Sequence, residues 1–207
     1  MKSSAGFTLI ELMTVIVILA IMLFLALPNF NVWLQNTQIR TAGEAVLNGM
    51  QLARAEAIRR NTNVRFQLVD SLTSSCALSD TGRNWVVSQA DPSGACQVAA
   101  SDTVAPQIVQ KKSSAEGSPN AVVTASPAAA DPSFNGTVTF NGFGSIATNV
   151  DGTPAISAIK INAPSIGADS RDLCVLVGTG GTIRMCDPKV VAPDTRTCGA
   201  VIPAGCL

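Results

Sequence analysis

The chain has 207 residues, of which 47% are hydrophobic and 14% are charged, and its 14 basic and 14 acidic side chains give a formal net charge of zero. This balance gives no whole-chain attraction to nucleic acid or to an acidic membrane, so such binding would need a local patch. The sequence contains no histidine, which excludes Ser-His-Asp and Cys-His catalysis and imidazole metal ligation, so we do not expect an enzyme. We also expect no bound metal and no other cofactor.

Apolar residues concentrate near the N-terminus, where residues 7–27 form a run of 21 residues with only three polar side chains. About 20 apolar residues in a helix span a bilayer, and this run is longer than the hydrophobic region of a usual cleaved signal peptide. We therefore predict a retained transmembrane and assembly helix over residues 7–28. The short hydrophilic segment 1–6 carries Lys2 as its charge and is expected to stay cytoplasmic, with the rest of the chain exported.

Glu11 is the exception within the apolar run, because a carboxylate in hydrocarbon costs about 3 kcal/mol on insertion scales and more in simulations. One interpretation places Glu11 shallow enough to reach the headgroup region. The other requires cleavage after Gly6: the new amine at Phe7 of one subunit pairs with Glu11 of a neighbour when the helices bundle. Such a pair would neutralise both charges.

Residues 6–12, GFTLIEL, resemble the class III signal of type IV pilins and type II secretion pseudopilins. The resemblance implies that residues 1–6 are a leader peptide, removed by a prepilin peptidase between Gly6 and Phe7, and that the new N-terminal Phe7 is methylated. It gives Glu11 a role in assembly. It also implies a single-pass protein of the bacterial inner membrane, with a periplasmic C-terminal part, that later enters a pilus or pseudopilus filament.

Beyond Pro28, where this family often kinks its helix, apolar residues recur every three or four positions, as in an amphipathic helix. We predict a helix over residues 7–60 whose continuation, residues 29–60, packs its apolar stripe on the protein's own sheet; a separate partner-binding role is the alternative. The stripe consists of Ile39, Ala42, Val46, Met50, Ala53 and Ala57.

Residues 61–207 contain eight short β-rich runs separated by Gly, Pro, Asn, Asp and Ser. This pattern predicts a periplasmic globular domain built as an antiparallel sandwich or as two packed sheets. With the long helix, the expected fold class is α+β. Residues 113–132 are expected to form a long surface connection with little core. The predicted strands are residues 63–69, 84–89, 105–110, 120–124, 136–140, 155–161, 172–177 and 182–186.

Six cysteines lie in the part expected to be exported, where an even number favours disulfides. Cys174 and Cys186 are equidistant from Gly180, so a hairpin centred there would place them opposite one another. The other pairs are chosen on proximity in the sequence. A zinc site is not expected because the cysteines are widely spaced and no CxxC occurs. The predicted disulfides are Cys174–Cys186, Cys76–Cys96 and Cys198–Cys206.

The layout as a whole resembles the GspH/FimT family of minor pilins and pseudopilins, on the segments 47–68 and 172–188 as well as the N-terminal signal. The resemblance implies a pilin fold, a β-sandwich on a helix, in a minor subunit that primes or caps a type IV pilus-like filament. The implied partners are other pilins, the prepilin peptidase, the inner-membrane assembly platform and, before assembly, the lipid bilayer. A type II secretion pseudopilin acting in protein export is the alternative.

A DNA-binding minor pilin is an alternative of another class. Some FimT relatives capture DNA through a Gly-Arg-x-Arg turn, which here reads Gly181-Thr182-Ile183-Arg184 and lacks the first arginine. Phosphate binding depends on clustered cations, whereas residues 61–207 hold 9 basic and 11 acidic side chains, a net charge of −2. Arg184 is therefore the single candidate DNA contact, and DNA is the least favoured partner.

Overall fold

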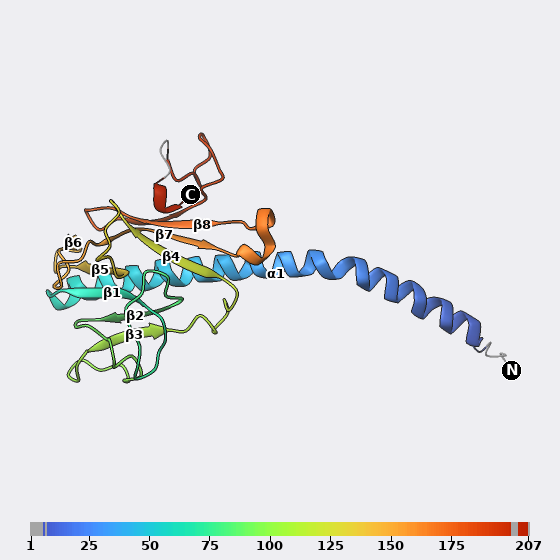
Figure 1. Ribbon diagram of the computed structural model, residues 1–207, viewed down its shortest axis with the longest axis horizontal. Helices are drawn as coiled ribbons and strands as arrows, with labels where there is room; N and C mark the ends of the chain where they lie inside the picture. Colours follow the sequence, from blue (N-terminus) through green and yellow to red (C-terminus); the bar gives the residue numbers. More distant parts are fainter. Residues whose placement is uncertain (1–5, 7, 200–202, 207) are drawn as a thin grey trace. The chain divides into compact units, whose positions relative to one another are not determined.

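The computed structural model describes residues 6, 8–199 and 203–206, with the backbone alone for residues 25–29. Its chain divides into two compact units, Met1–Leu34 and Gln35–Leu207. Helix α1, Leu9–Arg60, contributes to both units (Figure 1). The prediction of one long helix from the N-terminal region to Arg60 is confirmed.

In the first unit, the described large apolar side chains of residues 9–24 of α1 are exposed, between 54% for Ile18 and 78% for Phe24. Among the described residues, no helix is both long enough and apolar enough to cross a membrane. The transmembrane helix expected over residues 7–28 therefore stays a prediction.

The C-terminal end of α1 is closed by a Schellman motif. The Thr62 N–H donates to the Ala57 carbonyl at 3.2 Å and the Asn61 N–H donates to the Ile58 carbonyl at 3.2 Å. Asn61 has a φ of 50°, which is the left-handed conformation that asparagine tolerates better than most residues. These bonds satisfy carbonyls at the end of the helix and turn the chain directly into the first strand.

Ion pairs join the same helix end to the loop after the second strand. Glu56 accepts hydrogen bonds from Arg59 at 2.6 Å and from Arg60 at 2.7 Å, and Arg60 also contacts Asp102 at 2.6 Å. The Arg59 guanidinium, helped by that of Arg60, lowers the pKa of the Glu56 carboxyl to about 2. Glu56 therefore stays ionised at neutral pH and holds both arginines.

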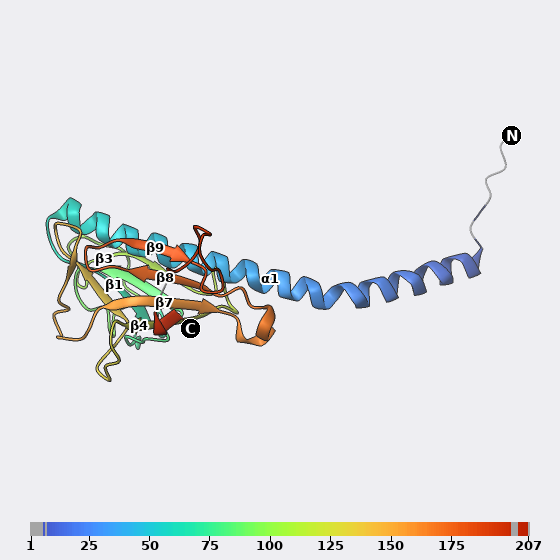
Figure 2. The same ribbon diagram turned by 90° about the horizontal axis from the view of Figure 1, so that it is seen from above.

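In the part of the chain that the structure describes, nine strands form two antiparallel sheets. Sheet A has the strand order β3 (Ile108–Lys112), β2 (Asn84–Ser88), β1 (Val64–Val69), β5 (Thr137–Phe140) and β6 (Ile146–Ala147). Sheet B has the strand order β4 (Val122–Pro127), β7 (Ile156–Asn162), β8 (Leu173–Val177) and β9 (Ile183–Cys186). The 3-10 helices Pro164–Asp169 and Ala204–Cys206 lie outside the sheets. Figure 2 shows β7, β8 and β9 of sheet B side by side.

All eight predicted strands are present, and the predicted α+β fold, a long helix packed on two antiparallel sheets, is confirmed. The ninth strand, β6, was not expected because its two residues are too few to show an alternating pattern. The expectation of little core in residues 113–132 is wrong. Strand β4 lies within this segment and pairs with β7, and its alternate residues Val123 and Ala125 are buried in the main core.

One core joins the helix to both sheets. The six residues of the apolar stripe are each at most 5% exposed, so the prediction that the stripe packs on the protein's own sheets is confirmed. They lie in one cluster with inward-facing residues of sheet A, such as Phe66 and Val138, and of sheet B, such as Ile159 and Val175. Fully burying each large apolar side chain stabilises the fold by about 1.5–3 kcal/mol.

Two helix glycines allow α1 to approach the sheets. A Cβ at Gly49 would lie 2.9 Å from Phe66 and 3.0 Å from Trp85, two large aromatic side chains that are themselves buried. A Cβ at Gly43 would lie 3.0 Å from the Met185 sulfur, which is the flexible type of side chain that fills irregular gaps.

The two glycines give a matched pair of alanine variants. Alanine is preferred to glycine in a helix by about 0.5–1 kcal/mol, so Gly43→Ala should leave the free energy of unfolding unchanged or raise it. Gly49→Ala should lower it by about 1–3 kcal/mol, because overpacking forces aromatic rings from their positions. Denaturant unfolding of the full chain in detergent, followed by circular dichroism, measures both. Equal stabilities would contradict the close contact at Gly49.

Candidate functional site

The N-terminal end of α1 is organised by Thr8 and Glu11. The Glu11 carboxylate accepts hydrogen bonds from the Thr8 backbone N–H at 2.9 Å and from the Thr8 hydroxyl at 2.8 Å, both on Oε2. The Glu11 N–H donates back to the Thr8 hydroxyl at 3.3 Å. This reciprocal arrangement is a capping box, which satisfies backbone donors at the helix start.

Sequence analysis missed this role of Thr8, although the pattern Thr-x-x-Glu before an apolar run is the usual indication of a capping box. Of the predicted processing residues, Gly6 is exposed and Phe7 lies outside the described residues. Cleavage between them, methylation of Phe7 and the assembly role of Glu11 therefore stay predictions.

The six cysteines form three disulfides. The predicted pair Cys76–Cys96 is confirmed, with its Cα atoms 6.1 Å apart. The other two predicted pairs, Cys174–Cys186 and Cys198–Cys206, are wrong. The structure instead joins Cys174 to Cys206 and Cys186 to Cys198, with Cα separations of 5.7 and 5.0 Å.

The predicted hairpin nevertheless places Cys174 directly opposite Cys186 on β8 and β9. The Gly178 N–H donates to the Thr182 carbonyl at 2.9 Å. Hydrogen-bonded pairs recur at every second residue of an antiparallel ladder, so Cys174 and Cys186 also form a hydrogen-bonded pair. The two side chains of such a pair are farther apart than those of the non-hydrogen-bonded pairs between them. A disulfide needs Cβ atoms about 3.8 Å apart. Each cysteine therefore bonds to the chain that crosses its face of the sheet.

That crossing chain is the C-terminal segment, residues 187–199 and 203–206, which we call the C-terminal clasp. Its two cysteines form a buried cluster with Cys174, Cys186, Ala158 and the partly buried Leu176 on sheet B. The 3-10 helix Ala204–Cys206 lies against β7 and β4. Two disulfides therefore fix the clasp to one face of sheet B.

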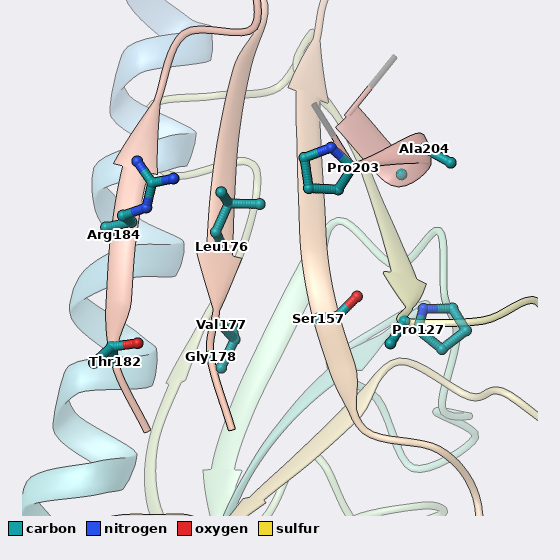
Figure 3. A pocket seen from close by; sticks show the side chains of 11 residues that line it. Pro127, Ser157, Leu176, Val177, Gly178, Thr182, Arg184, Pro203 and Ala204 are labelled. Atoms are coloured by element: carbon teal, nitrogen blue, oxygen red, sulfur yellow. The ribbon is translucent and has the colours of Figure 1, made fainter. Parts of the chain in front are cut away.

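Arg184, the candidate DNA contact, binds the clasp. Its guanidinium donates to the carbonyls of Thr197 at 3.1 Å and Cys198 at 2.6 Å. The side chain also borders a cavity of about 470 Å³ between the clasp and the ends of β4, β7 and β8 (Figure 3). Leu176, Pro203 and Ala204 contribute to its lining.

The two other cations near the hairpin are also bound to protein groups. The Lys189 ammonium donates to the Ser170 carbonyl at 2.6 Å. Arg196 pairs with Asp194 at 2.8 Å and lowers the pKa of the Asp194 carboxyl to about 2. Arg184, Lys189 and Arg196 therefore bind protein groups. Among the described residues, these three cations do not form a cluster that is free to bind phosphates.

Among the described residues, no group of three or more Cys, Asp or Glu side chains is arranged to hold a metal ion. Within this described part, the geometry presents two ordered features, the capped N-terminal end of α1 and a β domain with a disulfide-bonded clasp.

Comparison with known proteins gives two family matches. The sequence model described as type II transport protein GspH matches residues 42–181, more than half of the chain. The prokaryotic N-terminal methylation motif matches residues 1–27. No curated protein matches this chain.

Among solved structures, two crystal structures of the type IV minor pilin FimU from Pseudomonas aeruginosa PAO1 are similar to this chain. One, in space group P65, has 15% identity and a TM-score of 0.41, and the match covers 70% of this chain and 90% of FimU. The other, in space group P21, has 14% identity and a TM-score of 0.40, with coverage of 71% and 87%.

The disulfide pairing can be tested by digestion without reduction. Trypsin leaves the four C-terminal cysteines on three peptides, residues 172–184, 185–189 and 197–207. The observed bonds hold all three peptides together as one species, which separates into three on reduction. If the peptide 197–207 is instead released with an internal disulfide, the pairing in the structure is wrong. Mass spectrometry distinguishes the two results directly.

Proposed function

This chain belongs to the GspH family of type II transport proteins, and we propose that it is a minor pilin-like subunit that primes or caps a type IV pilus-like filament. The proposed life of the protein begins as a single-pass protein of the bacterial inner membrane. A prepilin peptidase cleaves it between Gly6 and Phe7, Phe7 is methylated, and the assembly platform moves the subunit into a filament of other pilins. Its role is architectural and involves no catalytic turnover.

The observation that carries this proposal is the contrast between the two parts of α1. Residues 39–57 bury an apolar stripe inside the protein's own core, whereas the described apolar side chains of residues 9–24 are more than half exposed. Exposed apolar surface of this extent requires another apolar environment. A bilayer supplies it before assembly, and the helices of neighbouring subunits supply it in a filament.

Glu11 supplies specificity in this proposal. Its carboxylate is exposed at the start of the apolar surface, where an ionised group is costly unless it is paired. The amine that cleavage creates at Phe7 of a neighbouring subunit is the proposed partner. The pairing would fix the axial position of one helix relative to the next.

A substitution at Glu11 can remove the charge of the side chain and keep its role in the capping box. Glutamine also functions in a capping box, so Glu11→Gln keeps the helix start and removes the charge. We expect the amount of this chain in sheared filaments, relative to the amount in membranes, to fall about tenfold or more, since a lost pairing of 1.4 kcal/mol is a factor of ten.

Thr8→Ala is the matched control, because it removes the capping hydroxyl and keeps the charge. Quantitative immunoblotting of filament and membrane fractions compares the two variants at equal expression. Wild-type incorporation of Glu11→Gln, together with failure of Thr8→Ala, would show that capping and not charge pairing controls assembly.

A pseudopilin of a type II secretion system is the second candidate, favoured by the printed description of the matching family as a type II transport protein. A deletion strain, its parent and a complemented strain separate the two. We expect quantitative mass spectrometry to find that pilins in the sheared filament fraction fall severalfold in the deletion strain while secreted proteins persist. Loss of secreted proteins with normal filaments would assign the chain to secretion. No change in either fraction would remove both functions.

A further inference from the structure

The face of sheet A that is turned away from the helix carries buried polar side chains next to the apolar cluster that contains Val86 and Ile108. Side chains alternate along β1, so Val64, Phe66 and Leu68 enter the main core while Arg65 and Gln67 point to the opposite face. Across this opposite face, Gln67 stands beside Thr137, and Arg65 stands beside Thr139. Among the described residues, seven polar side chains are buried, and five of them belong to this region: Gln67, Ser88, Thr137, Thr139 and Asn149.

A cavity of about 160 Å³ lies in this polar layer. Arg65 and Gln67 from β1 and Thr137 from β5 form its floor, and the loops that cover the sheet contribute Asp91, Asn149 and Asp151. This volume is large enough for several water molecules or one small ring.

Most of the buried polar groups here are already bonded. Asn149 accepts from the Thr139 hydroxyl at 2.8 Å and donates to the Thr137 carbonyl at 3.3 Å. The Ser88 hydroxyl lies within hydrogen-bond distance of the Ala90 carbonyl, at 2.7 Å, and of the Gln67 carboxamide oxygen, at 3.1 Å. These bonds hold the walls of the cavity in place without any bound molecule.

Two atoms in the walls are not bonded. In the part of the chain that the structure describes, Arg65 Nε and Thr137 Oγ1 are buried and have no hydrogen-bond partner. Thr137 is only 3% exposed, and both residues line the cavity. Leaving a buried polar group unsatisfied costs about 1–3 kcal/mol, so each atom favours a molecule in the cavity that can bond to it.

The charges around the cavity restrict the class of that molecule. The carboxylates of Asp91 and Asp151 disfavour an anion, and the Arg65 guanidinium disfavours a cation. Asp91 uses Oδ1 to accept from Ser93 and leaves Oδ2 unbonded among the described residues. A hydroxyl group suits this set, because it accepts from Arg65 or Thr137 and donates to Asp91.

We propose that this cavity binds a single sugar residue, such as the terminal unit of a glycan that the exported domain meets. Its hydroxyls would bond to Arg65, Thr137 and Asp91, and the apolar Leu78 and Val150 in the lining would contact the C–H face of the ring. Six of the eight described lining residues are polar or charged, which suits a ligand that carries several hydroxyl groups. The site would give the subunit a recognition role in addition to its place in a filament.

Saturation-transfer NMR on the full chain tests the proposal, in a detergent without a sugar headgroup. The probes are glucose, galactose, mannose and N-acetylglucosamine at millimolar concentration, with inorganic phosphate as a competing anion. We expect transfer to at least one sugar, which phosphate does not displace. Absence of transfer to all four sugars, or displacement by phosphate, would overturn the proposal and leave a water-filled or anion-binding cavity.

Thr137→Val is the decisive variant. It removes a hydroxyl that has no protein partner, so the melting temperature should not fall, while the sugar affinity should fall about tenfold. Asp91→Asn keeps the acceptor for Ser93 and should also weaken binding. Thr124→Val, on β4 of the other sheet, is the matched control and should bind normally. Unchanged affinity in both cavity variants would overturn the proposal.

Discussion

The burial of one helix face against both sheets is the constraint on which the rest of the second unit depends. Gly49 brings the helix onto Phe66 and Trp85 of sheet A, and Gly43 brings it close to Met185 of sheet B. Polar side chains at the start of this unit add bonds to the loops of sheet B, including Asn36 to the Asp169 carbonyl at 3.0 Å. Because these contacts are spread along residues 35–60, this part of α1 and the β domain form one packed unit.

The two sheets each need a cover on the face that the helix does not reach, and the covers differ in kind. Sheet A is covered by loops, one of which is closed by Cys76–Cys96 beside the buried Val86 and Ile108. Sheet B is covered by the C-terminal clasp and its two disulfides. Cross-links of this type restrict the unfolded chain. They allow short peptide segments, which bury little surface of their own, to remain in place.

The sequence predicts those parts of the fold that repeat with a fixed period. The 3.6-residue period identifies the stripe from Ile39 to Ala57, and short β-rich runs identify eight strands. Interactions between distant segments have no such period. The hairpin that opposes Cys174 and Cys186 was predictable, but the path of the clasp over that hairpin was not. The polar cavity could not be predicted for the same reason, since Arg65, Asp91 and Thr137 come from separate segments of the chain.

At the start of α1, capping and subunit pairing use different atoms of one carboxylate. Thr8 donates both of its hydrogen bonds to Glu11 Oε2, and Oε1 accepts none from the described residues. The capping box therefore orients the carboxylate and leaves one oxygen for an incoming amine. A group that is already oriented loses less conformational entropy when it binds. The Thr8 backbone N–H provides this orientation even without the hydroxyl, and the helix cap and the proposed contact between subunits do not compete for the same oxygen.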